Sequence, residues 1–90
     1  MRLAFIGGGV MARAVISGLK NAGINADIIV GEPLEIQRKS LQDDLKVETT
    51  SSNKDAVSGA DIVVIAVKPQ QLDAIQADLK SSLCERQTVL

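Results

Sequence analysis

The sequence predicts an α/β fold in which helices cover both faces of a parallel sheet. Short, continuous apolar runs alternate along the chain with stretches in which apolar residues recur at three- and four-residue steps. Each change of pattern falls at a cluster of Gly, Pro, Asn or Asp, the residues that commonly end helices and strands. Strands that alternate with helices in this way are joined by right-handed crossovers, so the expected sheet is parallel and doubly wound.

The first half of the chain supplies two predicted strands and two predicted helices. Residues 2–6 (RLAFI) form an apolar run typical of a strand buried on both faces. A helical pattern starts at Val10, and Gly23 is positioned to cap its C-terminus. A second buried strand begins at Asp27, and residues 34–41 form a helix with a charged outer face. The apolar stripe of the first helix is predicted to contain Met11, Ala14, Val15, Gly18, Leu19 and Ala22.

The second half continues the alternation. Residues 46–49 form a short strand, and residues 51–57 (SSNKDAV) form a capped helical turn. The third strong strand is DIVVIAV, residues 61–67, and TVL at residues 88–90 is expected to begin another strand. Another amphipathic helix is predicted between these strands from the spacing of Leu72, Ile75, Leu79 and Leu83. The sheet is therefore expected to be incomplete at the C-terminus.

Composition excludes several classes of function. Ten Lys and Arg residues balance 11 Asp and Glu, and Phe5 is the only aromatic residue, which argues against a nucleic-acid partner. Cys84 is the only cysteine, so the chain has neither an internal disulfide nor a multi-cysteine metal site, and no metal is predicted. The apolar residues 3–6 are too few for a membrane span or a secretion signal. We therefore expect a cytoplasmic protein without membrane contact.

A glycine triplet follows the first predicted strand and opens the first predicted helix. The run GGGVMA, residues 7–12, fits the pattern G-x-G-x-x-G/A of dinucleotide-binding proteins. In that pattern Gly7 permits the tight turn, Gly9 lets the backbone approach a pyrophosphate, and Ala12 lets the helix lie close to the strand. The helix N-terminus offers unpaired N–H groups and the positive end of its dipole to the phosphates.

An acidic residue stands at the expected distance from this motif. Glu32 lies 20 residues after Ala12, at the end of the second predicted strand, where a carboxylate can accept hydrogen bonds from ribose hydroxyls. A P-loop is disfavoured because no Gly-Lys-Ser/Thr follows the glycines. The sequence therefore predicts a Rossmann-type doubly wound sheet, with one dinucleotide-binding domain over residues 1–90.

The absence of some residue types limits the chemistry. The chain contains no His and no Tyr, so it lacks the proton donors of histidine-based and tyrosine-lysine dehydrogenases. One Cys without His cannot form the usual catalytic zinc site. Lys68 follows the third strong strand, where it could meet a phosphate or a ribose or could be an ordinary solvated lysine. The catalytic residues are left unassigned.

Four segments carry a family resemblance: AFIGGGVMARAVISGL, DIIVGEP, NKDAV and ADIVVIAVKPQQL. They are similar to the N-terminal nucleotide-binding domain of pyrroline-5-carboxylate reductase, the last enzyme of proline biosynthesis. The glycine motif is shared by many dehydrogenases, whereas the AVKP tetrad that closes the third strong strand is more selective. The resemblance implies reduction of a small cyclic imine to proline, with NADPH or NADH as hydride donor.

The resemblance also implies a set of cofactor-binding residues. Asn53 would lie by the adenosine ribose, and Glu32 and Pro33 would stand near its 2′ position. The pyrophosphate would be surrounded by Gly7, Gly8, Gly9, Val10 and Met11, and Ile6 is a further expected cofactor-binding residue. The path toward the nicotinamide would be lined by Ala66, Val67, Lys68 and Pro69.

Two positions depart from the family pattern. Val10 stands where the family often has Asn or Gln, which removes one side-chain hydrogen bond near the cofactor. Pro33 stands where many relatives have Arg or another polar residue for a 2′-phosphate, and Glu32 would repel that phosphate. The choice between NADH and NADPH stays open.

The family implies a partner domain as well. Its members have a helical C-terminal domain that forms the dimer and completes the substrate pocket, and this chain lacks it. We therefore expect a homo-oligomer through that domain, and we expect these 90 residues alone to be inactive. Two alternatives remain open: a related β-hydroxyacid or deazaflavin-linked NADP oxidoreductase, and a nucleotide-sensing regulatory domain like those of ion transporters.

Overall fold

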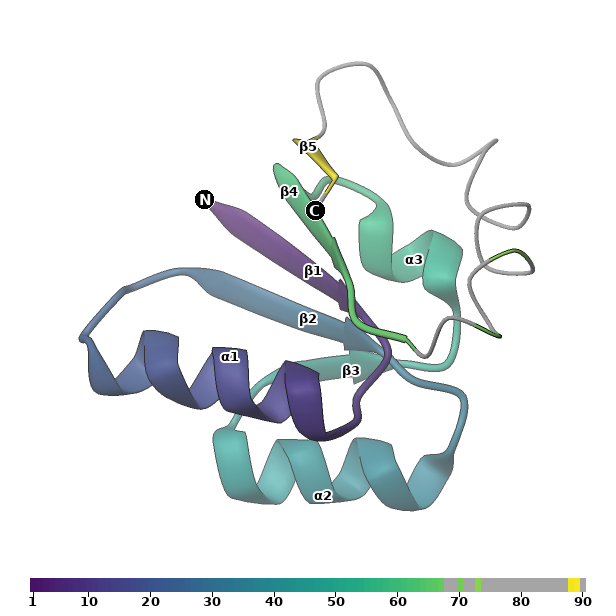
Figure 1. Ribbon diagram of the computed structural model, residues 1–90, viewed down its shortest axis with the longest axis horizontal. Helices are drawn as coiled ribbons and strands as arrows, with labels where there is room; N and C mark the ends of the chain where they lie inside the picture. The colour runs from purple at the N-terminus through teal and green to yellow at the C-terminus, as the bar shows by residue number, and fades with distance from the viewer. Residues whose placement is uncertain (68–69, 71–72, 74–87, 90) are drawn as a thin grey trace.

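The computed structural model describes residues 1–67, 70, 73 and 88–89, and it shows one parallel five-stranded sheet with the strand order β3-β2-β1-β4-β5 (Figure 1). The strands are β1 (Arg2–Ile6), β2 (Asp27–Gly31), β3 (Glu48–Thr50), β4 (Ile62–Ile65) and β5 (Thr88–Val89). The helices are α1 (Val10–Asn21), α2 (Glu35–Leu45) and α3 (Asn53–Val57). The predicted α/β class and parallel sheet are confirmed.

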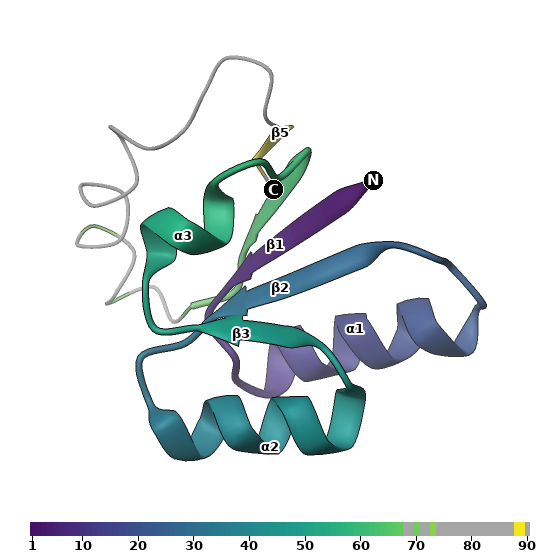
Figure 2. The same cartoon turned by 180° about the vertical axis from the view of Figure 1, so that it is seen from behind.

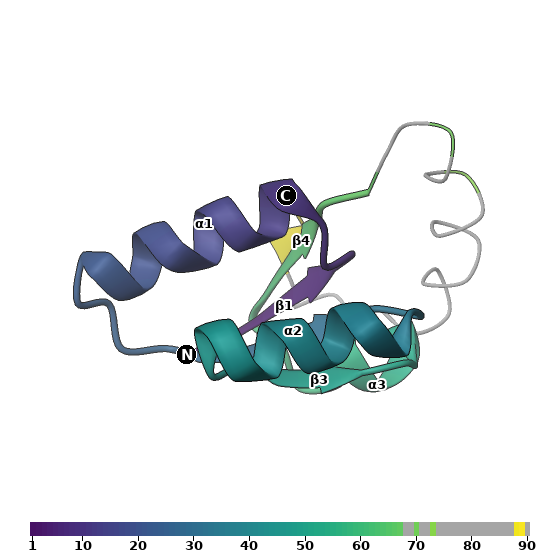
Figure 3. The same cartoon turned by 90° about the horizontal axis from the view of Figure 1, so that it is seen from below.

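Helices lie on both faces of the sheet. Helices α1 and α2 run beside each other on one face, and α3 packs on β1 and β2 from the other (Figures 1 and 3). Figure 2 shows the α3 face from behind. The crossovers between β1, β2 and β3 use the first face, and the crossover from β3 to β4 uses the second. The reversal of strand order at β1 makes the sheet doubly wound, as expected.

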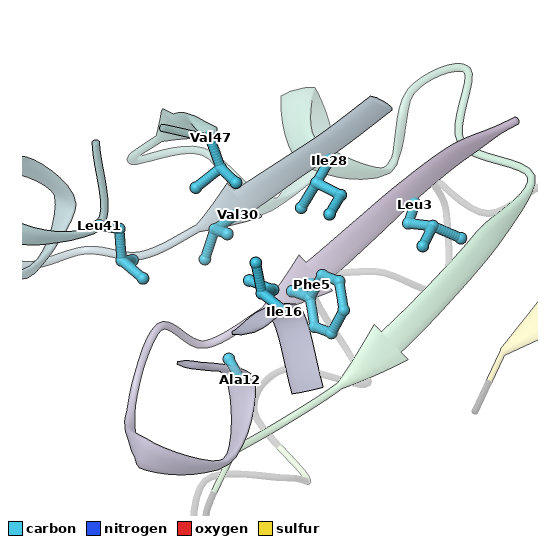
Figure 4. Close-up of a cluster of buried hydrophobic side chains, with 8 residues drawn as sticks. All are labelled: Leu3, Phe5, Ala12, Ile16, Ile28, Val30, Leu41 and Val47. Carbon is cyan, nitrogen blue, oxygen red and sulfur yellow. The ribbon is translucent and has the colours of Figure 1, made fainter. Parts of the chain in front are cut away.

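Alternation along β1 builds two separate cores. Leu3 and Phe5 belong to the core under α1 and α2, which Figure 4 shows. Ala4 and Ile6 belong to the core under α3. Because successive side chains of a strand point to opposite faces, a strand buried on both sides needs an unbroken apolar run. This explains why RLAFI contains no apolar-polar alternation.

The buried stripe of α1 differs from the prediction. Ala12 and Ile16 are fully buried against the sheet (Figure 4). Leu19, a predicted member of the stripe, packs partly against the same core. Met11 and Val15, by contrast, are 64% and 42% exposed. The sequence offers two apolar stripes with helical spacing, and periodicity fixes the spacing of a buried face but not which of two faces is buried. The close approach expected at Ala12 is confirmed.

The ends of α1 and α2 show what stops each helix. Gly23 has a positive φ of 74°, and the N–H groups of Gly23 and Ile24 donate to the carbonyls of Lys20 and Leu19. This is the Schellman arrangement, so the predicted role of Gly23 is confirmed. Helix α2 continues past the predicted end at residue 41 and stops where Lys46 takes a left-handed conformation, with φ 56°.

Two strand boundaries also shift. Strand β3 begins at residue 48 instead of 46, because α2 occupies the chain up to Leu45. Strand β4 ends at Ile65, two residues before the predicted end. The capped turn is confirmed as α3, whose N-cap Ser52 accepts a hydrogen bond from the Asp55 N–H. The predicted strand near the C-terminus is confirmed at residues 88–89, whereas the helix predicted from Leu72, Ile75, Leu79 and Leu83 lies outside the described residues.

The described residues contain neither a membrane-spanning helix nor a cluster of metal ligands. None of the helices there has both the length and the apolar composition needed to cross a membrane. Within the same part of the chain, no three His, Cys, Asp or Glu residues gather in a way that could hold a metal ion.

Candidate functional site

A groove with a volume of about 730 Å³ lies at the carboxyl ends of β1, β2 and β4. It is bounded by the turn between β1 and α1, the connection between β2 and α2, and the start of α3. This is the edge of a doubly wound sheet, beside the reversal of strand order, at which ligands bind. The groove is lined by Ile6, Gly7, Gly8, Gly9, Gly31, Glu32, Pro33, Leu34, Gln37, Asn53, Ala66, Val67 and Gln70.

Gly7 makes the turn out of β1. Its φ is 99°, a left-handed value that side chains other than hydrogen disfavour. A Cβ atom at Gly7 would also lie 2.6 Å from the carbonyl oxygen of Ala66. The Gly7 N–H donates to the carbonyl of Gly31 at an N···O distance of 2.8 Å. Both the backbone conformation and the approach to the end of β4 therefore require glycine at this position.

Gly9 differs from Gly7 in both respects. Its φ is −82°, which any residue adopts. A Cβ atom built on it meets no described atom within 4 Å. Neither backbone strain nor packing within the described chain explains a glycine here. The space that a side chain would fill lies open at the start of α1.

The N-terminus of α1 has neither a side-chain cap nor an acidic residue in its first turn. Its N-cap is Gly9, which has no side chain to accept a hydrogen bond. The first N–H groups of a helix have no partner within the helix and carry the positive end of its dipole. The start of α1 can therefore accept an anion in the space that Gly9 leaves open.

Glu32 follows β2 directly and is 8% exposed. One carboxylate oxygen accepts from the Gly8 N–H and the other from the Leu34 N–H, each at 2.9 Å. A Cβ atom at Gly8 would lie 2.6 Å from Cδ1 of Leu41, which is fully buried. Gly8 thus packs against the core and bonds to Glu32, while its neighbour Gly9 stays open.

Asn53 enters the groove from the opposite face of the sheet. It is the first residue of α3, and the cap at Ser52 holds that helix start in place. Its Oδ1 lies next to Gly31, where a Cβ atom would come within 2.8 Å of that oxygen. The end of β2 therefore needs glycine at residue 31 so that the amide can lie against the strand.

The groove brings together most of the site residues that the sequence suggested. Those that line it are Ile6, Gly7, Gly8, Gly9, Glu32, Pro33, Asn53, Ala66 and Val67. Val10 and Met11 do not line its walls; they lie in the first turn of α1 with 86% and 64% of their surface exposed. Lys68 and Pro69 lie outside the described residues.

Four lining residues were missed by the sequence analysis: Gly31, Leu34, Gln37 and Gln70. Gly31 and Leu34 flank the predicted pair at 32 and 33, so the neighbours of a strand end could have been included. Gln37 lies in the first turn of α2, three residues after its N-cap Leu34. Leu34 is a large apolar residue with 57% of its surface exposed beside the groove. In the sequence, Leu34 has the spacing of an ordinary apolar residue of the predicted helix, so it gave no sign of lining a groove.

Known proteins share this fold and much of this sequence. Pyrroline-5-carboxylate reductase of Pseudomonas aeruginosa is 37% identical over 90 residues, which are 99% of this chain and 33% of that protein. The enzyme of the same name from Vibrio alginolyticus is 44% identical over 72 residues, which are 79% of this chain and 26% of that protein. The chain thus spans a third or less of the length of these relatives.

Solved structures give the same result for the fold. A pyrroline-5-carboxylate reductase from Coxiella burnetii superposes with a TM-score of 0.86 and 36% identity over 92% of this chain and 31% of its own. Prephenate dehydrogenase from A. aeolicus, solved with NAD⁺, gives 0.85 at 19% identity over 99% of this chain and 32% of its own. The second likeness shows the Rossmann-type fold alone.

A family model also matches. It covers residues 2–90 and describes its members as NADP oxidoreductase, coenzyme F420-dependent. The match extends from β1 through the glycine turn and β4 to the end of the chain. This chain belongs to that oxidoreductase family.

Proposed function

We propose that the chain is the nucleotide-binding part of an NAD(P)H-dependent oxidoreductase that reduces 1-pyrroline-5-carboxylate to proline. The observation that carries the proposal is the open space at Gly9 beside the uncapped start of α1. A glycine that neither conformation nor packing requires is explained by a ligand that needs the space. A pyrophosphate fits the unpaired N–H groups and the dipole there.

The groove extends from this anion site in two directions. On one side, Pro33, Gln37 and Asn53 line the end of β2 and can surround an adenosine. On the other side, Ala66 and Val67 continue β4 and can line the path to a nicotinamide. The volume of about 730 Å³ is in the range of pockets that bury ligands larger than a single ring.

The cofactor supplies the hydride, and the chain supplies position. The turn at Gly7 directs the start of α1 toward the groove, and the packing of Ala12 and Ile16 on the sheet fixes the helix axis. Positioning of this kind is a large part of what a protein contributes to hydride transfer. The sequence contains no His or Tyr, so we assign the chain cofactor binding and leave proton donation to additional polypeptide.

The substrate assignment rests on the relatives. The curated reductases are 32–44% identical to the chain and are about three times as long. We infer that the whole protein acts on a small cyclic imine, that it works in the cytoplasm, and that a further domain forms a dimer and completes the substrate pocket. The 90 residues alone should bind the dinucleotide weakly and should not reduce the imine.

Nuclear magnetic resonance tests the proposed site directly. NADH or NADPH added to the ¹⁵N-labelled chain should shift the amide signals of Gly9, Val10 and Met11, together with that of Asn53. Shifts confined to the amino ends of the strands, around Lys20 and Lys46, would contradict the proposed site. Imine-dependent oxidation of NADPH by the 90 residues at the rate of a full-length reductase would contradict the proposal that this chain binds the cofactor and that a further domain completes the substrate pocket.

A further inference from the structure

We infer that Glu32 is a positioning residue whose carboxylate ties the glycine turn to the connection between β2 and α2. It acts on the cofactor through the Gly8 turn, by holding the backbone beside the open anion site. The inference rests on the proposed function for the cofactor, whereas the tie itself concerns the ligand-free protein.

Every polar group of Glu32 has a partner in a different part of the fold. Its two carboxylate oxygens accept from the N–H groups of Gly8, in the turn after β1, and Leu34, before α2. Its own N–H donates to the carbonyl of Thr50 at the end of β3, at 2.8 Å. Its carbonyl accepts from the Arg38 guanidinium of α2, also at 2.8 Å. Glu32 is therefore a junction of four segments.

The geometry of the tie depends on the residues around it. A Cβ atom at Gly8 would lie 3.3 Å from both Cβ and Cγ of Glu32, so the glycine allows the two backbones to approach. Arg38 also donates to the carbonyl of Pro33 at 2.8 Å, which holds the same connection from the side of the helix. The carboxylate thus joins two segments that are each fixed by other contacts.

The carboxylate holds the turn that borders the anion site. Both of its oxygens accept charge-assisted hydrogen bonds from the backbone, and the residue, which lines the groove, is 8% exposed. Because Gly8 directly precedes Gly9, displacement of Gly8 displaces the open anion site.

The first test needs no cofactor. Hydrogen exchange at the amides of Gly8 and Leu34 should be slow in the wild type. In Glu32→Gln one N–H faces the new NH₂ group, so at least one of the two amides should exchange about tenfold faster. Glu35→Gln makes the same charge change at the exposed first residue of α2 and should leave both amides protected. Unchanged exchange in Glu32→Gln would overturn the tie.

The second test separates positioning from ribose reading. Binding of NADH and of its adenosine 2′-deoxy analogue is measured in the wild type and in Glu32→Gln. Positioning through Gly8 predicts that the substitution weakens both ligands by the same factor, about tenfold. Direct reading of the hydroxyl by Glu32 predicts instead that the substitution weakens binding of NADH and leaves binding of the deoxy analogue unchanged. The residue and the hydroxyl would then be coupled in a double-mutant cycle. That second outcome would overturn the inference.

Glu32→Asp keeps the charge and removes one methylene, so it cannot reach both N–H groups. It provides the same comparison if the Gln variant does not fold. Failure of the wild type to bind any dinucleotide would refute the proposed function, and the exchange experiment would still decide whether the tie exists.

Discussion

Asn53 lies against the bare backbone of Gly31, so closely that a Cβ atom at Gly31 would come within 2.8 Å of the asparagine Oδ1. The contact joins the end of β2, a strand of the sheet, to the start of α3, a helix on one of its faces, and both residues line the groove. The same hypothetical Cβ would lie 3.2 Å from Cβ of Ala56. The position of the Asn53 amide in the groove therefore depends on the residue at 31.

We predict that Gly31→Ala moves Asn53 out of place. The nearest obstacle is the end of a polar side chain, which can rotate away, so unfolding should be easier by only about 1 kcal/mol. Dinucleotide affinity should fall by about the same factor as in Asn53→Ala, and the double variant should be no worse than either single variant. Calorimetric titration of the three variants checks this. Fully additive losses would show that Gly31 acts independently of Asn53.

Gly7 and Gly9 should respond differently to the same added methyl group. Gly7→Ala forces a side chain onto a φ of 99° and against the Ala66 carbonyl, so it should cost about 2 kcal/mol or more of folding stability. Gly9→Ala meets open space at an ordinary φ and should change stability by less than about 0.5 kcal/mol. Urea denaturation of both variants measures the difference. Equal destabilisation by Gly7→Ala and Gly9→Ala would contradict the left-handed conformation at Gly7 or the open space at Gly9.

The buried face of α1 can be tested with two neighbouring residues. Ile16 is fully buried, whereas Val15 is 42% exposed. Ile16→Ala should therefore cost about 2–5 kcal/mol, and Val15→Ala less than about 1 kcal/mol. Thermal and urea unfolding give both values. A larger loss at Val15 than at Ile16 would restore the stripe that periodicity first suggested.

Gly18 offers a gain in stability. It lies inside α1 and is exposed, and a Cβ atom at this position would meet no described atom within 4 Å. Gly18→Ala should stabilise the fold by about 0.5–1 kcal/mol, because glycine loses more backbone entropy than alanine in a helix. A rise in the urea midpoint checks this. A fall would show that the position packs against something beyond the described residues.

The centre of the sheet was predictable because β1 and β2 are buried along almost their whole length. RLAFI and DIVVIAV are apolar without alternation, which suits strands of a parallel sheet covered on both sides. The phase of α1 was not predictable, because Ala12-Ile16-Leu19 and Met11-Val15-Gly18 have equivalent spacing. What selects the first set is the direction in which the turn after Gly7 sends the helix, which is a tertiary property.

In the candidate site, too, some features could be predicted from the sequence and others depend on tertiary structure. The glycines and Glu32 could be found from their spacing alone, and the groove contains them. The turn at Gly7 and the open space at Gly9 were expected from the motif, whereas the packing of Gly8 against Leu41 was not, because the two residues are far apart in the sequence. The hydrogen bonds of Glu32 were equally hidden, since they join residues 24 positions apart in the sequence.

The most direct measurement of the central claim is calorimetric titration of NADH and NADPH into the wild type and Gly9→Val. Valine at 9 fills the open space at the start of α1, so binding of both cofactors should fall below detection while the unfolding free energy stays nearly unchanged. Gly18→Val, the same change on the exposed part of α1, serves as the control and should keep wild-type affinity. Wild-type affinity in Gly9→Val would contradict the assignment of this turn as the pyrophosphate site.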